Sequence, residues 1–242
     1  MQAAAKISVI GIGYRPLDKK ALETVLNSDV ILASGRLFEV CQLYEEFDAV
    51  NDKIKVLDNI NETIKFMHDN YATKKIVLLA SGDPLFSGIG GIVIGEFGKD
   101  AVEVVPDLSS IQMAFSKIKE PWDDALLISL HGGPDPAKRR RLPYGVHDIP
   151  VLVGKHNKIA VLTDRETSPA TIARAIMDFD AVWGFCTSGL TMYVCERLGY
   201  EDERITRGLP EEIAKQVFSD LNVVIILGRQ PGLKNSDSSQ IV

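Results

Sequence analysis

Strand-like and helix-like segments alternate strictly through the first half of the chain. Short runs rich in β-branched residues occur at residues 7–10, 30–33, 76–80 and 102–105. Longer segments, whose apolar residues recur at helical spacing, occupy residues 17–26, 36–44, 60–71, 88–97 and 109–118. Such alternation favours a mostly parallel sheet that helices cover on both faces. The sequence therefore predicts an α/β fold.

The alternation stops at residues 119–124, which read Lys-Glu-Pro-Trp-Asp-Asp. The proline and the acidic residues indicate a hinge between two lobes. We expect an N-terminal α/β lobe at residues 1–120 and a C-terminal α/β lobe at residues 121–234. The polar residues 235–242 are expected to form a disordered tail.

The second half of the chain has a less regular pattern. Its strand-like segments are residues 125–130, 159–162, 181–186, 192–197 and 223–227, and its helical segments are residues 169–177 and 210–218. Ser168 is expected to cap the helix that starts at Pro169. A short connection between residues 181–186 and 192–197 predicts an antiparallel pair, so the second sheet is expected to be mixed.

Composition excludes several classes of protein. The net charge of −6 argues against a protein that binds nucleic acid mainly through phosphates. No apolar run is long enough to span a bilayer, and the first residues lack the apolar core of a signal peptide. The three cysteines favour neither a disulfide framework nor a zinc site, and no metal is expected. We therefore expect a cytoplasmic protein.

A carboxylate follows the most apolar strand-like segment of the chain. Residues 81–86 read Ser-Gly-Asp-Pro-Leu-Phe and precede a glycine-rich stretch. Ligands of open α/β sheets bind at the carboxyl ends of strands, and Pro84 restricts the backbone of Asp83. Asp83 and Gly82 are therefore candidate ligand-binding residues, and the alternative is a turn that only connects strand to helix.

Two more loops of the first half leave strands at the same expected edge, one at residues 11–16 and one at residues 106–110. Gly11 and Gly13 follow the first strand, but the third glycine of a dinucleotide fingerprint is absent, because Pro16 stands there. No Gly-Lys-Ser/Thr motif occurs, which excludes a P-loop. The alternatives are a tight turn at Gly11 and Gly13 and simple helix capping by the serines at 109 and 110.

Polar residues also follow strands of the second half. His131 ends the first of these strands and Asp164 follows the next. A lone histidine is more often a structural hydrogen-bonding group than a catalytic one, but its position at a strand exit makes His131 a candidate. The cationic run at residues 138–141 is either a solvated loop or a contact for an anionic substrate.

Taken in chain order, these motifs resemble those of the tetrapyrrole methylase family. The resemblance covers nearly the whole chain. Within the family, the chain is most similar to members that methylate carbon 5 of a precorrin in cobalamin (vitamin B12) biosynthesis. The segments that carry it are residues 80–86, 121–124, 129–132, 162–164 and 220–224. It implies two α/β lobes with S-adenosyl-L-methionine in the cleft between them, and a homodimer.

The resemblance also implies residue roles. The implied cofactor-binding residues are Gly11, Gly13, Tyr14, Gly82, Asp83, Phe86, Ser110, Ile111, Leu130 and His131. His131 is also the candidate catalytic residue, while Arg15 and Arg36 are candidate counter-ions for the carboxylates of a precorrin. The sequence departs from the usual Pro-Gly of the family twice, at Tyr14-Arg15 and at Pro106-Asp107.

Several readings stay open at this point. The substrate carbon could be another position of the tetrapyrrole, and relatives with similar lobes methylate ribosomal RNA or a modified histidine of a translation factor. A nicotinamide-dependent oxidoreductase and a non-catalytic corrinoid carrier are rivals from other classes. The sequence does not show whether the precorrin carries cobalt. The methylation of carbon 15 and the decarboxylation are expected of a separate chain.

Overall fold

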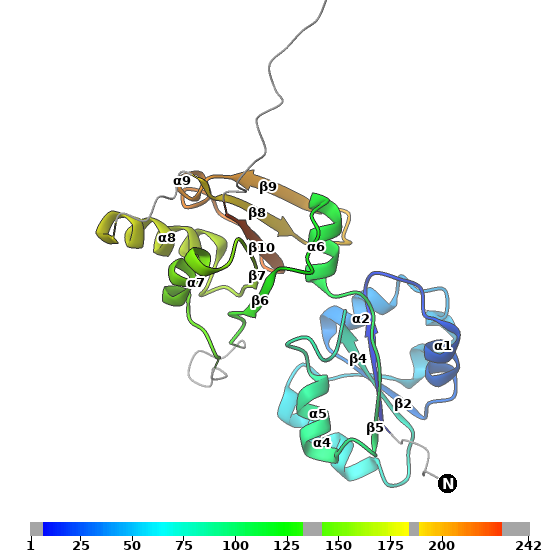
Figure 1. Ribbon diagram of the computed structural model, residues 1–242. Helices are drawn as coiled ribbons and strands as arrows, with labels where there is room; N and C mark the ends of the chain where they lie inside the picture. The colour runs from blue at the N-terminus through cyan, green and yellow to red at the C-terminus, as the bar shows by residue number, and fades with distance from the viewer. Residues whose placement is uncertain (1–6, 133–141, 184–188, 229–242) are drawn as a thin grey trace, which may run out of the picture. The chain divides into compact units, whose positions relative to one another are not determined.

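The computed structural model describes residues 7–132, 142–183 and 189–228 (Figure 1). The chain forms two compact units, the first ending at Ser110 and the second beginning at Ile111. Each unit contains one five-stranded sheet. The predicted tail at residues 235–242 and the cationic run at residues 138–141 lie outside the described residues.

The first unit is built around an all-parallel sheet with the strand order β3-β2-β4-β1-β5. Its elements are β1 (Ile7–Ile12), α1 (Lys19–Leu26), β2 (Val30–Ala33), α2 (Gly35–Cys41), α3 (Phe47–Val50), η1 (Asn51–Lys53), β3 (Ile54–Val56), α4 (Ile60–Asn70), β4 (Ile76–Ser81), α5 (Gly90–Phe97) and β5 (Val102–Val105). The four strands expected from the sequence are all present. The short edge strand β3 was not predicted.

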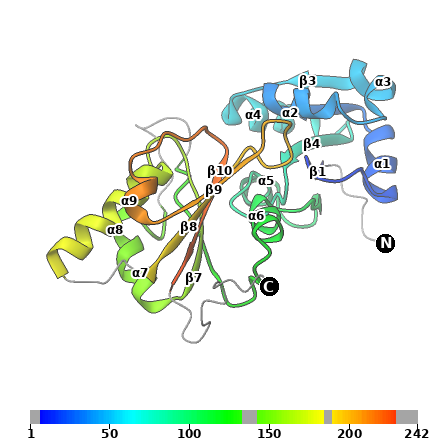
Figure 2. The ribbon, with the colours of Figure 1, turned by 90° about the horizontal axis from the view of Figure 1, so that it is seen from above.

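Helices cover both faces of this sheet, which explains why β1 is buried along its whole length (Figure 2). On one face, Ile7 and Val9 pack with Met67 of α4 and Val93 of α5. On the other face, a small cavity is lined by Ile12 together with side chains of α1, α2 and α3. Successive residues of β1 therefore contribute to two different apolar layers.

The second unit contains a mixed sheet with the strand order β6-β7-β10-β8-β9. Its elements are α6 (Ser110–Ile118, which starts at the unit boundary), β6 (Leu126–Ser129), η3 (Val146–Asp148), α7 (Ile149–Lys155), β7 (Lys158–Leu162), α8 (Pro169–Trp183), β8 (Thr191–Glu196), β9 (Arg204–Gly208), α9 (Pro210–Ile213) and β10 (Asn222–Leu227). Strands β6 and β7 are parallel, whereas the other pairs are antiparallel. The predicted mixed sheet is confirmed.

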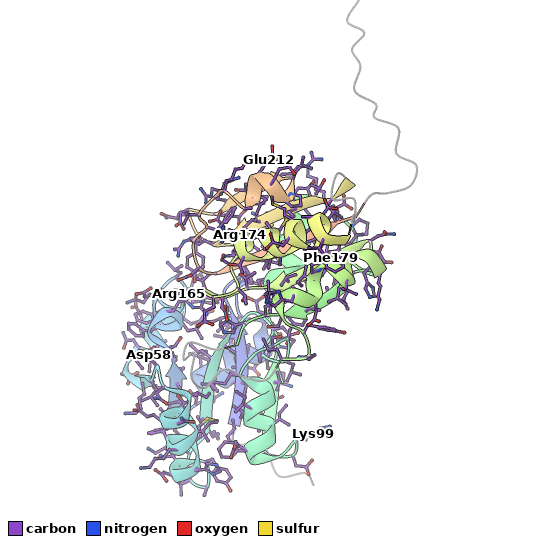
Figure 3. The ribbon with its side chains drawn as sticks, turned by 90° about the vertical axis from the view of Figure 1, so that its left-hand side faces the viewer. Asp58, Lys99, Arg165, Arg174, Phe179 and Glu212 are labelled. Carbon is purple, nitrogen blue, oxygen red and sulfur yellow. The ribbon has the colours of Figure 1, made fainter. Side chains whose placement is uncertain are left out.

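Helices α7, α8 and α9 pack on one face of the second sheet, as Figures 1 and 3 show. Arg174 of α8, labelled in Figure 3, donates from Nη1 to the carbonyl of Ala214 at 3.1 Å and so joins α8 to the end of α9. The hydroxyl of Ser168 accepts from the Thr171 amide at 3.2 Å, which confirms the predicted cap of α8.

The prediction of a strand at residues 181–186 is wrong for residues 181–183, which are the part of this segment that the structure describes. Helix α8 continues to Trp183, and the remaining residues of that segment lie outside the described chain. The antiparallel partners of β8 are β10 and β9 instead. The apolar residues of the last turns of α8 fit a buried strand and a helix equally well, because a short run has no decisive periodicity. Strand β9 was not predicted, and the helix expected at residues 210–218 ends at Ile213.

Helix α6 and the expected hinge both belong to the second unit. Lys117 of α6 pairs with Glu203 at 2.6 Å. The nearly buried Lys158 at the start of β7 donates to the carbonyl of Pro121 at 2.6 Å and to Asp124 at 2.8 Å. The second unit therefore begins at Ile111, in the first turn of α6, whereas the sequence pattern predicts a second lobe from residue 121.

Candidate functional site

Three loops meet at the carboxyl edge of the first sheet, where β1 lies between β4 and β5. The Gly82 amide donates to the carbonyl of Ile12 at 3.0 Å, and the Asp107 amide donates to the carbonyl of Gly82 at 3.2 Å. A Cβ atom on Gly11 would lie 1.9 Å from the Gly82 oxygen and 2.6 Å from the Asp107 nitrogen. Gly11 is therefore required by the packing of the protein's own backbone.

A glycine is also required at position 82. Its φ of +58° is a left-handed conformation, and a Cβ there would lie 2.6 Å from the carbonyl of Leu108. Gly13 differs from both, because its φ is +130° and no atom lies within 4 Å of an added Cβ. The open space at Gly13 leaves room for a ligand to approach the backbone.

The loop after β1 is held by Asp107 and Tyr44. The Asp107 carboxylate, whose side chain is 5% exposed, accepts from the amides of Tyr14 at 2.7 Å and Arg15 at 3.3 Å. The Tyr44 hydroxyl accepts from the Gly13 amide at 2.8 Å and donates to the carbonyl of Arg15 at 3.0 Å. Burial raises the pKa of Tyr44 above its ordinary value, so the phenol stays protonated and can donate.

The Gly-Asp-Pro loop forms a hydrogen-bonded turn after β4. Asp83 is half-buried, and its Oδ1 accepts from the Leu85 amide at 2.8 Å, which leaves Oδ2 available for a ligand. The carbonyl of Pro84 accepts from the Gly90 amide at 2.9 Å. Ser87 adopts a φ of +56°, which is strained for a residue with a side chain and is frequent at functional sites.

The remaining candidate residues from the first half of the chain differ in exposure, and Ile111 among them is the first residue of the second unit. Phe86 in the Gly-Asp-Pro loop and Ser110 at the start of α6 are half-buried. Arg36 lies in the first turn of α2, after β2, and is also half-buried. Ile111 is only 1% exposed, so its side chain is a packing group. The guanidinium of Arg15 pairs with Asp107 at 2.8 Å.

A second group of polar residues lies at the carboxyl ends of the parallel strands β6 and β7. His131 is exposed and directly follows Leu130, whose side chain belongs to the core of the second unit and is 1% exposed. The Leu130 amide donates to the carbonyl of Leu162 at 2.8 Å, and its carbonyl lies 3.2 Å from the Thr167 hydroxyl oxygen. Leu130 therefore anchors the loop that carries His131.

Asp164 holds this loop from the neighbouring strand. Its Oδ2 accepts from the Gly132 amide at 3.0 Å, while Oδ1 accepts from the Thr167 amide at 2.9 Å and the Thr167 hydroxyl at 2.7 Å. The His131 amide donates to the hydroxyl of Ser129 at 3.3 Å. Asp164 thus joins the exit of β6 to the exit of β7.

The structure brings together Gly11, Gly13, Tyr14, Arg15, Gly82 and Asp83 in the first unit, and Leu130 and His131 in the second. Sequence reasoning missed the roles of Tyr44 and Thr167 and the anchoring roles of Asp107 and Asp164. Position after a strand was a signal for the two aspartates. No local signal could have found Tyr44, because its contacts with Gly13 and Arg15 come from distant parts of the chain.

The set of groups at these loops fits an adenosyl cofactor in its chemistry. Such a cofactor offers ribose hydroxyls and an ammonium group, which a carboxylate such as Asp83 and a hydroxyl such as Ser110 can bind. Among the described residues, no group of His, Cys, Asp and Glu has the arrangement of a metal site. No described helix is long and apolar enough to cross a membrane.

Comparison with known proteins assigns the family. Residues 6–214 match the family model of the Tetrapyrrole (Corrin/Porphyrin) Methylases. A relative from Methanocaldococcus jannaschii, named a probable cobalt-precorrin-7 C(5)-methyltransferase, is 30% identical over 229 residues, which are 92% of this chain and 98% of the relative. A precorrin-6Y C(5,15)-methyltransferase [decarboxylating] from Sinorhizobium is 30% identical over 151 residues, which are 62% of this chain and 32% of that protein.

A solved structure agrees on the fold. The precorrin-6Y methylase from Archaeoglobus fulgidus superposes with a TM-score of 0.65 at 18% identity, covering 93% of this chain and 97% of that one. The match of the family model, the full-length relative and the shared fold confirm the predicted family and its α/β architecture. Members of this family are S-adenosylmethionine-dependent methyltransferases, and the chain belongs to the tetrapyrrole methylase family.

Proposed function

We propose that the protein transfers a methyl group from S-adenosyl-L-methionine to carbon 5 of a precorrin or cobalt-precorrin in cobalamin biosynthesis. The observation that carries this proposal is the 30% identity to a carbon-5 methyltransferase along almost the whole length of both chains. Polar loops at the carboxyl ends of strands in both units support it, because such loops are where α/β proteins bind ligands. Family membership favours this activity over that of a nicotinamide-dependent oxidoreductase.

The cofactor contacts are proposed from the placement of the loops. Oδ2 of Asp83 binds the ribose or ammonium group, since Oδ1 is already used by the Leu85 amide. Gly13 offers open space beside its backbone, and the Ser110 hydroxyl and the Phe86 ring complete the first unit's contribution. For Leu130 and His131 of the second unit, cofactor binding is proposed on the resemblance to the family alone. At Leu130 it is assigned to the backbone, because the side chain is buried in the core.

The cofactor supplies a methyl group that is already activated by a sulfonium. The residues of the protein therefore need to orient the acceptor carbon and exclude water, and proximity alone can supply several kcal/mol of the barrier. His131 is exposed at the exit of β6 and is proposed to act on the tetrapyrrole, either by positioning it or by accepting a proton. Arg36 is proposed as a counter-ion for its carboxylates.

Some further properties belong to the same proposal. The Sinorhizobium relative named for both carbon 5 and carbon 15 is far longer than the segment that matches this chain. A separate partner chain for the carbon-15 methylation and decarboxylation is proposed on the resemblance to the family alone. A homodimer in the cytoplasm is proposed on the resemblance to the family alone.

The decisive experiment is a methyl-transfer assay with the full-length protein. The protein is incubated with S-adenosylmethionine carrying a ¹³C-labelled methyl group and with precorrin and cobalt-precorrin substrates, and the product is examined by mass spectrometry and ¹³C NMR. One added methyl group at carbon 5 supports the proposal. A methyl group at another carbon would assign the protein to a different step, and absence of transfer to every tetrapyrrole would reject it.

Asp83→Ala is expected to weaken binding of S-adenosylhomocysteine about tenfold, because a charged hydrogen-bonding group is lost. Isothermal titration calorimetry measures the affinity. Asp83→Asn is the matched control, since its side-chain oxygen can still accept from the Leu85 amide and preserve the turn. If Asp83→Ala binds as tightly as the wild type, Asp83 is not a cofactor ligand.

A further inference from the structure

We propose that Asp107 is a built-in anion that sets the shape of the cofactor-binding loop after β1, and that it acts together with Arg15 as a positioning residue. This inference rests on the proposed function for the identity of the ligand. It assigns roles to the two positions at which the sequence departs from the Pro-Gly pattern, because Asp107 and the Tyr14-Arg15 pair bind each other.

The contacts account for both oxygens of the carboxylate. Oδ2 accepts from the amides of Tyr14 at 2.7 Å and Arg15 at 3.3 Å. Oδ1 accepts from Nε of Arg15 at 2.8 Å and from the amide of Leu108 at 2.7 Å. Successive backbone amides that point to one spot form an anion-binding nest, and here the anion is the protein's own side chain.

The Asp107 carboxylate is shielded from water, so its hydrogen bonds replace the hydration that it would otherwise have. The Asp107 side chain is 5% exposed, so its charge depends on these donors and on the guanidinium of Arg15 for its stabilisation. Nη2 of Arg15 also donates to the carbonyl of Pro106 at 3.3 Å, which attaches the arginine to the strand exit that carries Asp107. The loop after β1 is thereby tied to the loop after β5.

This arrangement changes what the loop after β1 can offer a ligand. The amides of Tyr14 and Arg15 donate to Asp107, and the amide of Gly13 donates to the Tyr44 hydroxyl. The loop therefore does not receive the carboxylate of the cofactor through these three amides. It contributes a fixed backbone shape and the open space at Gly13, while Arg15 works as an internal partner of Asp107.

The test compares three substitutions in the full-length protein. Asp107→Ala removes the anion. Asp107→Asn keeps the size of the side chain, but its NH₂ group faces either the two donors of Oδ2 or the two donors of Oδ1. Arg15→Gln removes the guanidinium, which donates to Oδ1, and leaves the two backbone contacts of Oδ2 in place. Asp29→Ala is the matched control, because Asp29 also accepts from a backbone amide, that of Lys75 at 2.7 Å, but lies at the amino ends of the strands.

Two readouts separate this proposal from the proposed function. Without any cofactor, hydrogen exchange of the Tyr14 and Arg15 amides is expected to accelerate at least about tenfold in Asp107→Ala and Asp107→Asn, and to slow again when formate is added to Asp107→Ala. Separately, the Kd for S-adenosylhomocysteine is expected to rise about tenfold in both variants, less in Arg15→Gln, and not in Asp29→Ala. Formate is expected to restore part of the affinity of Asp107→Ala.

The outcomes are distinguishable. Unchanged exchange at Tyr14 and Arg15 in both Asp107 variants would overturn the built-in anion, whatever the ligand. Faster exchange with unchanged affinity would overturn the positioning role. If the wild type binds neither S-adenosylmethionine nor S-adenosylhomocysteine, the proposed function fails, while the exchange and formate measurements still decide whether Asp107 is the anion of the loop. If Asp107→Ala does not fold, Asp107→Asn and Arg15→Gln carry the same comparison.

Discussion

Two aspartates with the same local task hold the loops at the strand exits. Asp107 follows β5 and accepts from the loop after β1, while Asp164 follows β7 and accepts from the Gly132 amide after β6. A carboxylate can accept several hydrogen bonds at once, so one side chain can fix a whole turn of backbone. Both carboxylates stand at strand exits, where α/β proteins bind ligands, but their observed contacts are with the protein's own backbone.

His131 is the residue whose chemistry is most open to a direct test. His131→Ala is expected to leave S-adenosylhomocysteine binding nearly unchanged and to slow methyl transfer about 100-fold, because a positioned acid, base or hydrogen-bonding group is lost. Single-turnover kinetics with the labelled cofactor measures the rate. His156→Ala is the control, since His156 is exposed just before the amino end of β7. Full activity of His131→Ala would show that the imidazole has no part in the reaction.

Gly11 provides a residue-scale test of the site's backbone packing. Gly11→Ala is expected to destabilise the protein by at least about 3 kcal/mol, because its Cβ would lie 1.9 Å from the carbonyl oxygen of Gly82. Gly95→Ala is the control, because Gly95 lies in α5 with nothing within 4 Å of an added Cβ, and it is expected to stabilise the protein by about 1 kcal/mol. Urea unfolding measures both, and similar free energies of unfolding would contradict the packing argument.

At the scale of elements, a buried carboxylate joins two antiparallel strands of the second sheet. Glu196 of β8 lies opposite Arg204 of β9, and the pair is joined by two hydrogen bonds, at 2.6 Å and 2.9 Å. Ser219 adds its amide at 2.8 Å and its hydroxyl at 3.1 Å. Burial raises the pKa of Glu196, but these contacts outweigh burial, so the pKa lies below its ordinary value of 4.5.

This lowered pKa predicts an acid-dependent stability. The contribution of ionised Glu196 is complete above pH 4.5 and is lost as the pH falls through the lower pKa of the folded state. Glu196→Gln is therefore expected to lower the Tm at pH 7 and to differ less from the wild type as the pH decreases below 4.5. Thermal unfolding followed by circular dichroism measures this, with the exposed Glu201→Gln as control. A difference in Tm that stays constant with pH would remove the assignment to Glu196.

At the scale of the whole molecule, each unit has apolar clusters of its own among the described residues. One cluster in the first unit includes Ile7 and Val102, and one in the second unit includes Ile128 and Ile226. Both tryptophans, Trp122 and Trp183, belong to the second unit. Tryptophan fluorescence therefore follows the unfolding of the second unit, whereas far-ultraviolet circular dichroism follows both units.

The separate cores predict two unfolding transitions that can be shifted independently. Met67→Ala in the first core is expected to cost about 2–5 kcal/mol, because Met67 is completely buried. It should lower the urea midpoint seen by circular dichroism and leave the fluorescence midpoint unchanged. Ile172→Ala in the second core is the matched variant and should shift the fluorescence transition. Coincident shifts of both signals in both variants would mean that the two units unfold as one cooperative body.

Sequence patterns were sufficient to predict the alternating elements of the first unit and the strand exits that carry polar residues. The mixed second sheet was predicted as well, but from a pairing of residues 181–186 with 192–197, whereas β8 pairs with β10 and β9. These features are local, since periodicity, β-branched runs and capping residues act within a few positions. The segment at 181–186 shows the limit, because a short apolar run suits a strand and a helix alike. Which polar groups bind each other could not be predicted in this way, because it depends on the order of the strands in each sheet. The contacts of Asp107 with Tyr14 and Arg15 and of Tyr44 with Gly13 join residues far apart in the chain, and only strand order brings them together.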